Sequence, residues 1–183
     1  QREGYLPAHI TDILLTHCHF DHVGGLETIR RYSGARLHMH HADATIVRSG
    51  LAGRPVQPGP GLVSRLVTSS MVGGAPMQTS KVIVDHEIRE EGSSELPEGF
   101  RAVFTPGHTR GHVSFMYEPD GVMFVGDAAT HVMGLGHPFL YEDPAAAVAS
   151  EQKLTDMSFD VAHFGHGRPI RRQASDRFRR RFL

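Results

Sequence analysis

The sequence feature that most constrains this chain is a short segment in which metal-binding side chains crowd together. Residues 16–22 read Thr-His-Cys-His-Phe-Asp-His and directly follow an apolar run typical of a strand. His17 and His19 are two positions apart, so both rings can point to one side of an extended segment. Asp21 and His22 follow where the chain turns, and they can face a second metal ion. Imidazole and carboxylate ligands together suit zinc, and also iron or manganese.

Three later segments repeat this arrangement, because each places a metal-binding residue beside glycine after a short apolar run. The run ending at Phe104 leads into Thr-Pro-Gly-His-Thr-Arg-Gly-His, which ends at His112. Asp127 follows Gly126 at the end of a second run, and residues 163–167 read His-Phe-Gly-His-Gly. We therefore expect four strand ends to converge on one buried metal centre.

Taken together, these segments resemble the metallo-β-lactamase superfamily, whose HxHxDH, GHT, GD and GHG elements occur in the same order. The resemblance covers nearly the whole chain and implies an α/β fold. Specifically, it implies an αββα sandwich, with two mixed sheets face to face, helices outside and metals at one edge. We expect residues 1–183 to form a single metallo-β-lactamase-like domain. Only 16 residues precede His17, whereas several strands do in the family, so we expect this domain to be N-terminally incomplete and to lack those strands.

The resemblance also implies a full set of ligands for two metal ions, with zinc favoured over iron or manganese. The expected ligands are His17, His19 and His108 for the first ion, Asp21, His22 and His166 for the second, and Asp127 as the bridge between them. Two such ions, about 3.5–4 Å apart, would bring the pKa of a bridging water toward ~7 and create a hydroxide that attacks a carbonyl carbon. Asp21 and Asp127 are therefore the expected catalytic carboxylates, and Asp21 is placed to hold the proton of the nucleophile.

Several further side chains near these motifs are candidates for supporting roles. Thr109 is expected to hydrogen-bond the metal loops, and His112 is expected either to do the same or simply to pack. His131 and His137 are candidates for lining the substrate pocket. Cys18 lies between two ligands in sequence, but alternation points it away from them, so we expect it to be packed.

Periodicity predicts helices and strands that alternate along the chain. The expected helices are 26–32, 42–47, 62–67, 145–157 and 174–183, and the expected strands are 9–16, 35–40, 82–88, 100–104, 112–117, 122–125 and 159–164. His41 or Asp43 is expected to begin the second helix as a cap or first-turn residue, although residues 40–43 could instead form another metal cluster. The glycine- and proline-rich stretch 50–79 is a candidate substrate lid, with an ordinary surface loop as the alternative.

Composition limits the classes of partner. The 183 residues carry a formal net charge of −1 and are 39% hydrophobic, so no nucleic-acid partner is expected. The arginine run of residues 177–181 is read as a solvated helix face. A single cysteine excludes an intrachain disulfide and fits the cytoplasm, and no apolar run reaches the ~18 residues of a membrane span. A small-molecule substrate is expected, and a homo-oligomer remains an open alternative.

The function that this resemblance favours is a metal-dependent hydrolase of the glyoxalase II or lactonase-like branch. Such an enzyme would use a metal-bridging hydroxide to cleave a small ester, thioester or lactone. The first alternative is a mononuclear iron sulfur (persulfide) dioxygenase that uses only His17, His108 and Asp127. Further alternatives are a nuclease of the same superfamily, a true β-lactamase, and an inactive or incomplete domain.

Overall fold

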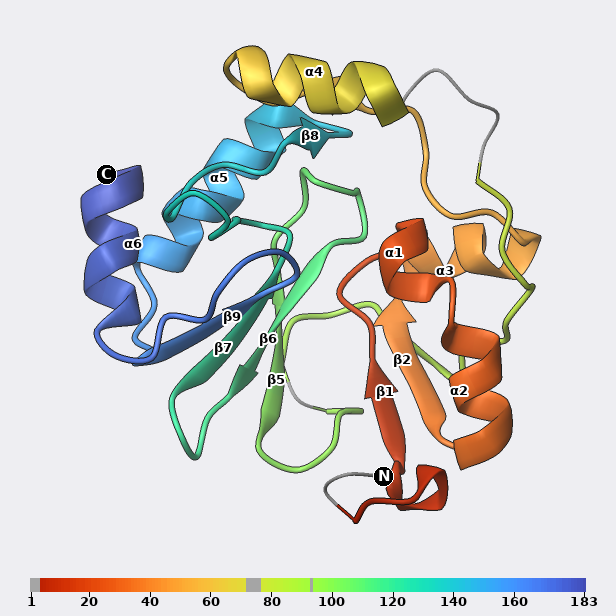
Figure 1. Ribbon diagram of the computed structural model, residues 1–183. Coiled ribbons are helices and arrows are strands. Elements are labelled where there is room, and N and C mark those ends of the chain that lie inside the picture. The colour runs from red at the N-terminus through yellow and green to blue at the C-terminus, as the bar shows by residue number, and fades with distance from the viewer. Residues whose placement is uncertain (1–3, 72–76, 93) are drawn as a thin grey trace.

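Two sheets lie face to face in the computed structural model, which describes residues 4–71, 77–92 and 94–183 (Figure 1). The first sheet has the order β1-β2-β4 and consists of β1 (Asp12–Leu14), β2 (Arg36–His40) and β4 (His86–Ile88). The second has the order β5-β6-β7-β9 and consists of β5 (Phe100–Phe104), β6 (Val113–Tyr117), β7 (Val122–Gly126) and β9 (Val161–Phe164). A third, short pair joins β3 (Gln57–Pro58) to β8 (Leu140–Tyr141).

Strand direction differs between the two main sheets. In the second sheet β5, β6 and β7 are antiparallel neighbours while β7 and β9 run parallel, so that sheet is mixed, as predicted. The three described strands of the first sheet are all parallel, which differs from the expected mixed sheet. Helices connect these strands, and a helical crossover returns the chain to the same end of the sheet.

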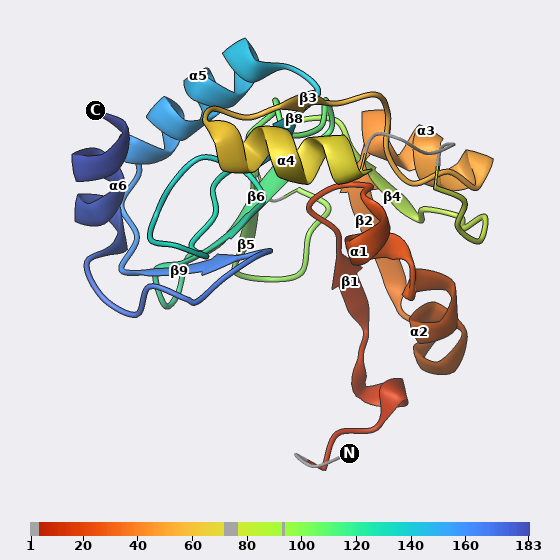
Figure 2. The same cartoon turned by 45° about the horizontal axis from the view of Figure 1, so that its top comes forward.

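Helices cover the outer face of each sheet, which confirms the predicted α/β sandwich (Figure 1). On the first sheet lie α1 (Phe20–Val23), α2 (Leu26–Ser33) and α3 (His41–Ser49), and on the second lie α5 (Pro144–Thr155) and α6 (Ala174–Phe182). A 3-10 turn at Pro7–His9 precedes β1. The helix α4 (Leu62–Met71) crosses the top of the molecule in Figure 1 and lies across its front, beside β3 and β8, in Figure 2. No helix among the described residues is both long and apolar enough to span a bilayer.

Side-chain alternation along the strands builds the core. Ala102 and Phe115 lie in the cluster between the sheets, together with Ile88 from β4. Val103 and Met116, the next residue along each strand, lie instead in the cluster that packs under α5 and α6. This alternation fixes the register of the second sheet, and so it fixes where the metal-binding residues at the strand ends emerge.

Most element boundaries agree with the sequence prediction, and two differences have clear causes. Asp143 caps α5 as predicted, because its Oδ1 accepts hydrogen bonds from the amides of residues 145 and 146, both at 3.0 Å. His41 and Asp43 lie in the first turn of α3, as predicted, but the cap is His40, whose ring accepts from the amide of residue 42 at 3.2 Å. The strand expected at 82–88 shortens to β4, because the carboxylate of Asp85 takes the amide of residue 37 at 2.8 Å and interrupts the ladder.

Candidate metal centre

The predicted ligands meet at one end of the two sheets. The loop after β1 carries His17 and His19, and the short helix α1 carries Asp21 and His22 in its single turn. The second sheet supplies the remaining ligands from the ends of β5, β7 and β9. Three groups of side chains have all their ligand atoms within 4.8 Å of one another, and these are His17, His19 and His108; His17, His22 and Asp127; and Asp21, His22 and His166.

Asp127 lies between the two halves of this cluster. Its Oδ2 is 3.4 Å from Nε2 of His108 and 3.3 Å from Nε2 of His166. On the first side, Nδ1 of His19 lies 2.8 Å from Nε2 of His108. On the second side, Nε2 of His166 lies 3.0 Å from Oδ2 of Asp21. The arrangement therefore gives Asp127 the position of a bridging carboxylate.

Three buried polar atoms in the cluster test whether these residues fit metal ions. Nε2 of His17, Nε2 of His22 and Oδ1 of Asp127 have no hydrogen-bond partner among the described residues. Burying such atoms without a partner costs about 1–3 kcal/mol each. Cations held by the cluster would satisfy these atoms, and the nitrogen and oxygen donors are those that zinc, iron and manganese accept. The side chains present therefore fit a two-metal centre.

The charge state of the cluster also suits metal binding. Burial lowers the pKa of His108 to about 3, and burial likewise holds the pKa of His17 well below its usual range, so both rings are neutral and can ligate. His166 behaves differently, because its hydrogen bonds to Asp127 and Asp21 raise its pKa to about 10. In the metal-free chain this imidazolium supplies the positive charge that the two carboxylates require, and a metal ion would replace that charge.

A chain of hydrogen bonds orients the bridging aspartate. Nε2 of His112 accepts from the Asp127 amide at 2.9 Å, so its Nδ1 carries the proton and donates to Oγ1 of Thr105 at 2.8 Å. Oγ1 of Thr105 lies 3.0 Å from Oγ of Ser114, which donates to the carbonyl of Val125 at 2.9 Å. His112, for which the sequence left packing and support as alternatives, thus contacts the backbone of a ligand directly.

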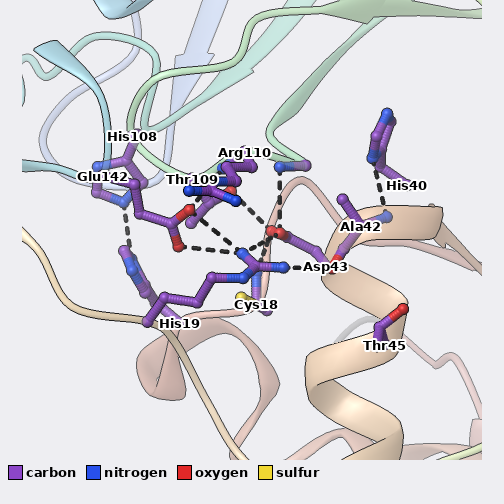
Figure 3. A network of polar contacts seen from close by, with 12 residues as sticks. Cys18, His19, His40, Ala42, Asp43, Thr45, His108, Thr109, Arg110 and Glu142 are labelled. Carbon is purple, nitrogen blue, oxygen red and sulfur yellow. Dashed lines mark hydrogen bonds and ion pairs between the residues drawn. The ribbon is translucent and has the colours of Figure 1, made fainter.

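Asp43 joins the two metal-binding loops, and sequence reasoning missed this role (Figure 3). Its carboxylate is wholly buried and accepts from the Cys18 amide at 3.1 Å, from Oγ1 of Thr109 at 2.7 Å and from the Gly111 amide at 3.1 Å. Cys18 lies between two ligand histidines, and Thr109 directly follows His108. One side chain therefore holds the loop from the first sheet against the loop from the second.

Arg54 completes this network, and no local pattern in the sequence indicated it. Nη1 of Arg54 lies 2.9 Å from Oδ1 of Asp43 and 3.1 Å from Oε1 of Glu142, and its Nη2 donates to the carbonyl of Ala42. Glu142 also accepts from the Arg110 amide at 2.9 Å. Two buried carboxylates thus share one guanidinium behind the metal centre.

Cys18 and Gly165 show how closely the backbone surrounds the ligands. The Cys18 side chain is fully buried in the core cluster of the first sheet, as expected, and burial raises its thiol pKa. At Gly165 an added Cβ would lie 1.9 Å from Oδ1 of Asp127, so only glycine leaves room for the bridging carboxylate. The glycine that precedes His166 therefore has a steric cause.

A cavity of about 660 Å³ opens beside the metal centre. Residues 51–56 and Met77 line it, so part of the stretch expected to form a lid does lie against the cavity, while residues 72–76 fall outside the described residues. His131 and His137 are not among the described lining residues, which corrects that expectation. Nδ1 of His131 is held 2.6 Å from the carbonyl of residue 168, and Nδ1 of His137 is 2.8 Å from Oε1 of Glu151.

Comparison with curated proteins gives relatives of moderate identity. The probable metallo-hydrolase YflN of Bacillus subtilis is 28% identical over 174 residues, which cover 86% of this chain and 64% of the relative. A hydroxyacylglutathione hydrolase of Fuscovulum blasticum is 31% identical over 147 residues, which cover 79% of this chain and 43% of the relative. The chain thus spans less than two thirds of the length of either protein.

Solved structures share the fold. The B3 metallo-β-lactamase BLEG-1 superposes with a TM-score of 0.65 at 26% identity, covering 87% of this chain and 70% of that one. TTHA1623 in a di-iron-bound form gives a TM-score of 0.57 at 27% identity and covers 86% and 70%. A family model described as the metallo-beta-lactamase superfamily matches residues 1–166 and spans all seven ligand positions. With its ligands gathered at the shared edge of two sheets, this chain belongs to the metallo-β-lactamase superfamily.

Proposed function

We propose that this chain is a binuclear metallo-hydrolase that cleaves a small ester, thioester or lactone. Members of the superfamily are mostly metal-dependent hydrolases. The observation that carries the proposal is the position of Asp127, whose Oδ2 lies 3.4 Å and 3.3 Å from the histidines of the two ligand groups. A carboxylate shared between two clusters is the arrangement that two-metal hydrolysis needs.

Different residues of the chain have different roles at this site. When bound, the metal ions would supply a hydroxide at neutral pH and would polarise the carbonyl of the substrate. Asp21 lines the cavity and its carboxylate is half-exposed, so it orients the nucleophile and holds its proton. His19 and His108 form the cavity wall on the other side. The apolar side chains of the cavity exclude water from the reacting carbonyl.

Zinc is the metal we propose, with iron and manganese as alternatives. The seven histidine and aspartate ligands suit zinc, while a structural relative, TTHA1623, was solved in a di-iron-bound form. Ligand softness alone does not separate these metals, since availability also decides which one is bound. Relatives named hydroxyacylglutathione hydrolase support a thioester among the proposed substrate types.

Elemental analysis of the purified chain, followed by hydrolysis assays, tests this function. The expected result is about two zinc ions per chain and cleavage of thioesters or lactones that is lost in Asp127→Asn and kept in Asp176→Asn. Asp176 is an exposed partner of Arg179 on α6, so this variant controls for the loss of a carboxylate elsewhere. One iron per chain with oxygen uptake on persulfides would instead indicate the dioxygenase.

A further inference from the structure

Apolar side chains make up most of the wall of the cavity beside the metal centre. Its volume of about 660 Å³ is that of a small-molecule site. Away from the ligands, the wall includes Phe20, Ile46, Leu51, Val56, Val132 and Phe139. Thr130 carries the one hydroxyl among the described lining residues, and this hydroxyl already donates to the carbonyl of His166 at 3.3 Å. The wall therefore favours burial of apolar groups over hydrogen bonding.

Arg54 is the only lysine or arginine among the described residues of the wall, and its charge is already neutralised. Its guanidinium contacts the carboxylates of Asp43 and Glu142, at 2.9 Å and 3.1 Å. Burial would lower the pKa of Arg54, but its hydrogen bonds and charge attraction to Asp43 and Glu142 together outweigh burial, and the pKa is raised. In the part of the cavity away from the metal centre, a carboxylate on a substrate would therefore lose its hydration without gaining a free cation.

We propose that the substrate carries an uncharged, apolar acyl chain that occupies this cavity, and that acyl groups ending in a carboxylate are poor substrates. Ligands from both metal groups, His19 and His166 among them, line the same cavity. A chain bonded directly to the reacting carbonyl therefore enters it. This inference rests on the hydrolase function proposed above and adds the class of substrate.

The test compares three thioesters of one thiol, N-acetylcysteamine, on the zinc-loaded protein. The acyl groups are acetyl, hexanoyl and adipoyl, so the leaving group is constant and adipoyl is hexanoyl with a terminal carboxylate. We expect kcat/KM to rise roughly fourfold for each methylene added between acetyl and hexanoyl. Adipoyl should fall roughly tenfold or more below hexanoyl. Equal rates for hexanoyl and adipoyl, or a preference for acetyl, would overturn the inference.

A variant with added charge tests the same point from the side of the protein. Val132 lines the cavity and is 52% exposed, so Val132→Lys should fold normally and place a free cation at the mouth. The ratio of adipoyl to hexanoyl cleavage should rise several-fold in Val132→Lys and stay unchanged in Val132→Met. An unchanged ratio in both variants would contradict the account of specificity by charge.

Binding of uncleavable analogues separates this inference from the proposed function. The hexyl and 5-carboxypentyl thioethers of N-acetylcysteamine are titrated into the protein by calorimetry. Tighter binding of the hexyl thioether without cleavage of any thioester, or of the matching esters and lactones, would overturn the hydrolase function and keep the apolar cavity. Cleavage of all three thioesters without preference would overturn the substrate class and leave the hydrolase function standing.

Discussion

Asparagine at position 43 would test whether the buried carboxylate of Asp43 holds the metal loops together. The Asp43→Asn side chain keeps its shape but replaces one acceptor oxygen with an NH2 group. Every hydrogen bond to this carboxylate comes from a donor, and these donors are the amides of Cys18 and Gly111, the hydroxyl of Thr109 and the guanidinium of Arg54. The hydroxyl can turn to accept, but the amides cannot, so either orientation of Asn leaves at least one buried N–H unpaired.

The size of the effect follows from these partners. One unsatisfied buried donor costs about 1–3 kcal/mol. Arg54 also loses one of its two carboxylate partners, although Glu142 remains 3.1 Å away. The free energy lost by breaking this buried ion pair therefore stays near its lower limit of about 3 kcal/mol. Together these terms predict a loss of about 4–6 kcal/mol in the free energy of unfolding. Because Cys18 and Thr109 adjoin ligand histidines, zinc affinity should fall roughly 10- to 100-fold.

Urea unfolding and competition with a chromophoric zinc chelator measure the two effects. The control is Asp176→Asn, which removes an exposed carboxylate 2.9 Å from Arg179 and should change stability by only about 0–1 kcal/mol. If Asp43→Asn matched this control in both stability and zinc affinity, the carboxylate would not be holding the loops. Loss of stability with unchanged zinc affinity would show that Asp43 supports the fold alone.

Three further outcomes follow from the site. Gly165→Ala should lose bound metal in elemental analysis, because its methyl group would lie 1.9 Å from Oδ1 of Asp127. The control Gly25→Ala, whose added methyl group has nothing within 4 Å, should keep its metal. Equal metal contents in the two variants would refute the steric argument. Cys18 should resist a thiol reagent at pH 8 until urea is added, since burial raises its pKa and suppresses the thiolate; native-state reactivity would contradict its burial. Removal of zinc by a chelator should lower the Tm, and added zinc should raise the Tm as its concentration increases, because only the folded chain assembles the site. A Tm that does not depend on zinc would count against metal binding here.

The candidate ligands could be nominated from the sequence because their motifs, in their order, resemble those of the metallo-β-lactamase superfamily. His17 and His19 are fixed by their separation of two, and Asp127 and His166 by the glycines that precede them. Gly165 shows the physical basis, since no other residue leaves space for the carboxylate of Asp127. The structure brings these side chains together, while the assignment of each one to an ion comes from the family resemblance and stays a prediction.

The network behind the ligands was not predictable, because its members come from separate parts of the chain. Asp43 lies in the first turn of α3, where an acid is ordinary, and Arg54 lies in a loop rich in glycine and proline. Only tertiary packing brings Glu142 to the same guanidinium. His137 failed as a cavity residue for the same reason, since its partner Glu151 on α5 is distant in sequence.

The boundaries that differed show how tertiary contacts override local pattern. Val82 and Val84 alternate like strand residues and are both buried. The amide of Leu37, however, donates to the carboxylate of Asp85, so it is not free to pair with the backbone and extend the strand. Periodicity reports which side chains are buried, whereas strand pairing depends on which backbone groups remain free.

Each ligand group draws on both sheets, and this division has a mechanical consequence. In all three groups, residues 17–22 of the first half meet a histidine or aspartate of the second half. A bound ion is therefore a cross-link between the two layers of the sandwich, and it closes a loop that contains most of the chain. Unlike a disulfide, it is released when the sandwich opens, so it stabilises the folded state by its binding free energy. Metal loss should accordingly loosen the sandwich from the ligand-bearing edge inward, and amide hydrogen exchange should accelerate there before it does under α5 and α6.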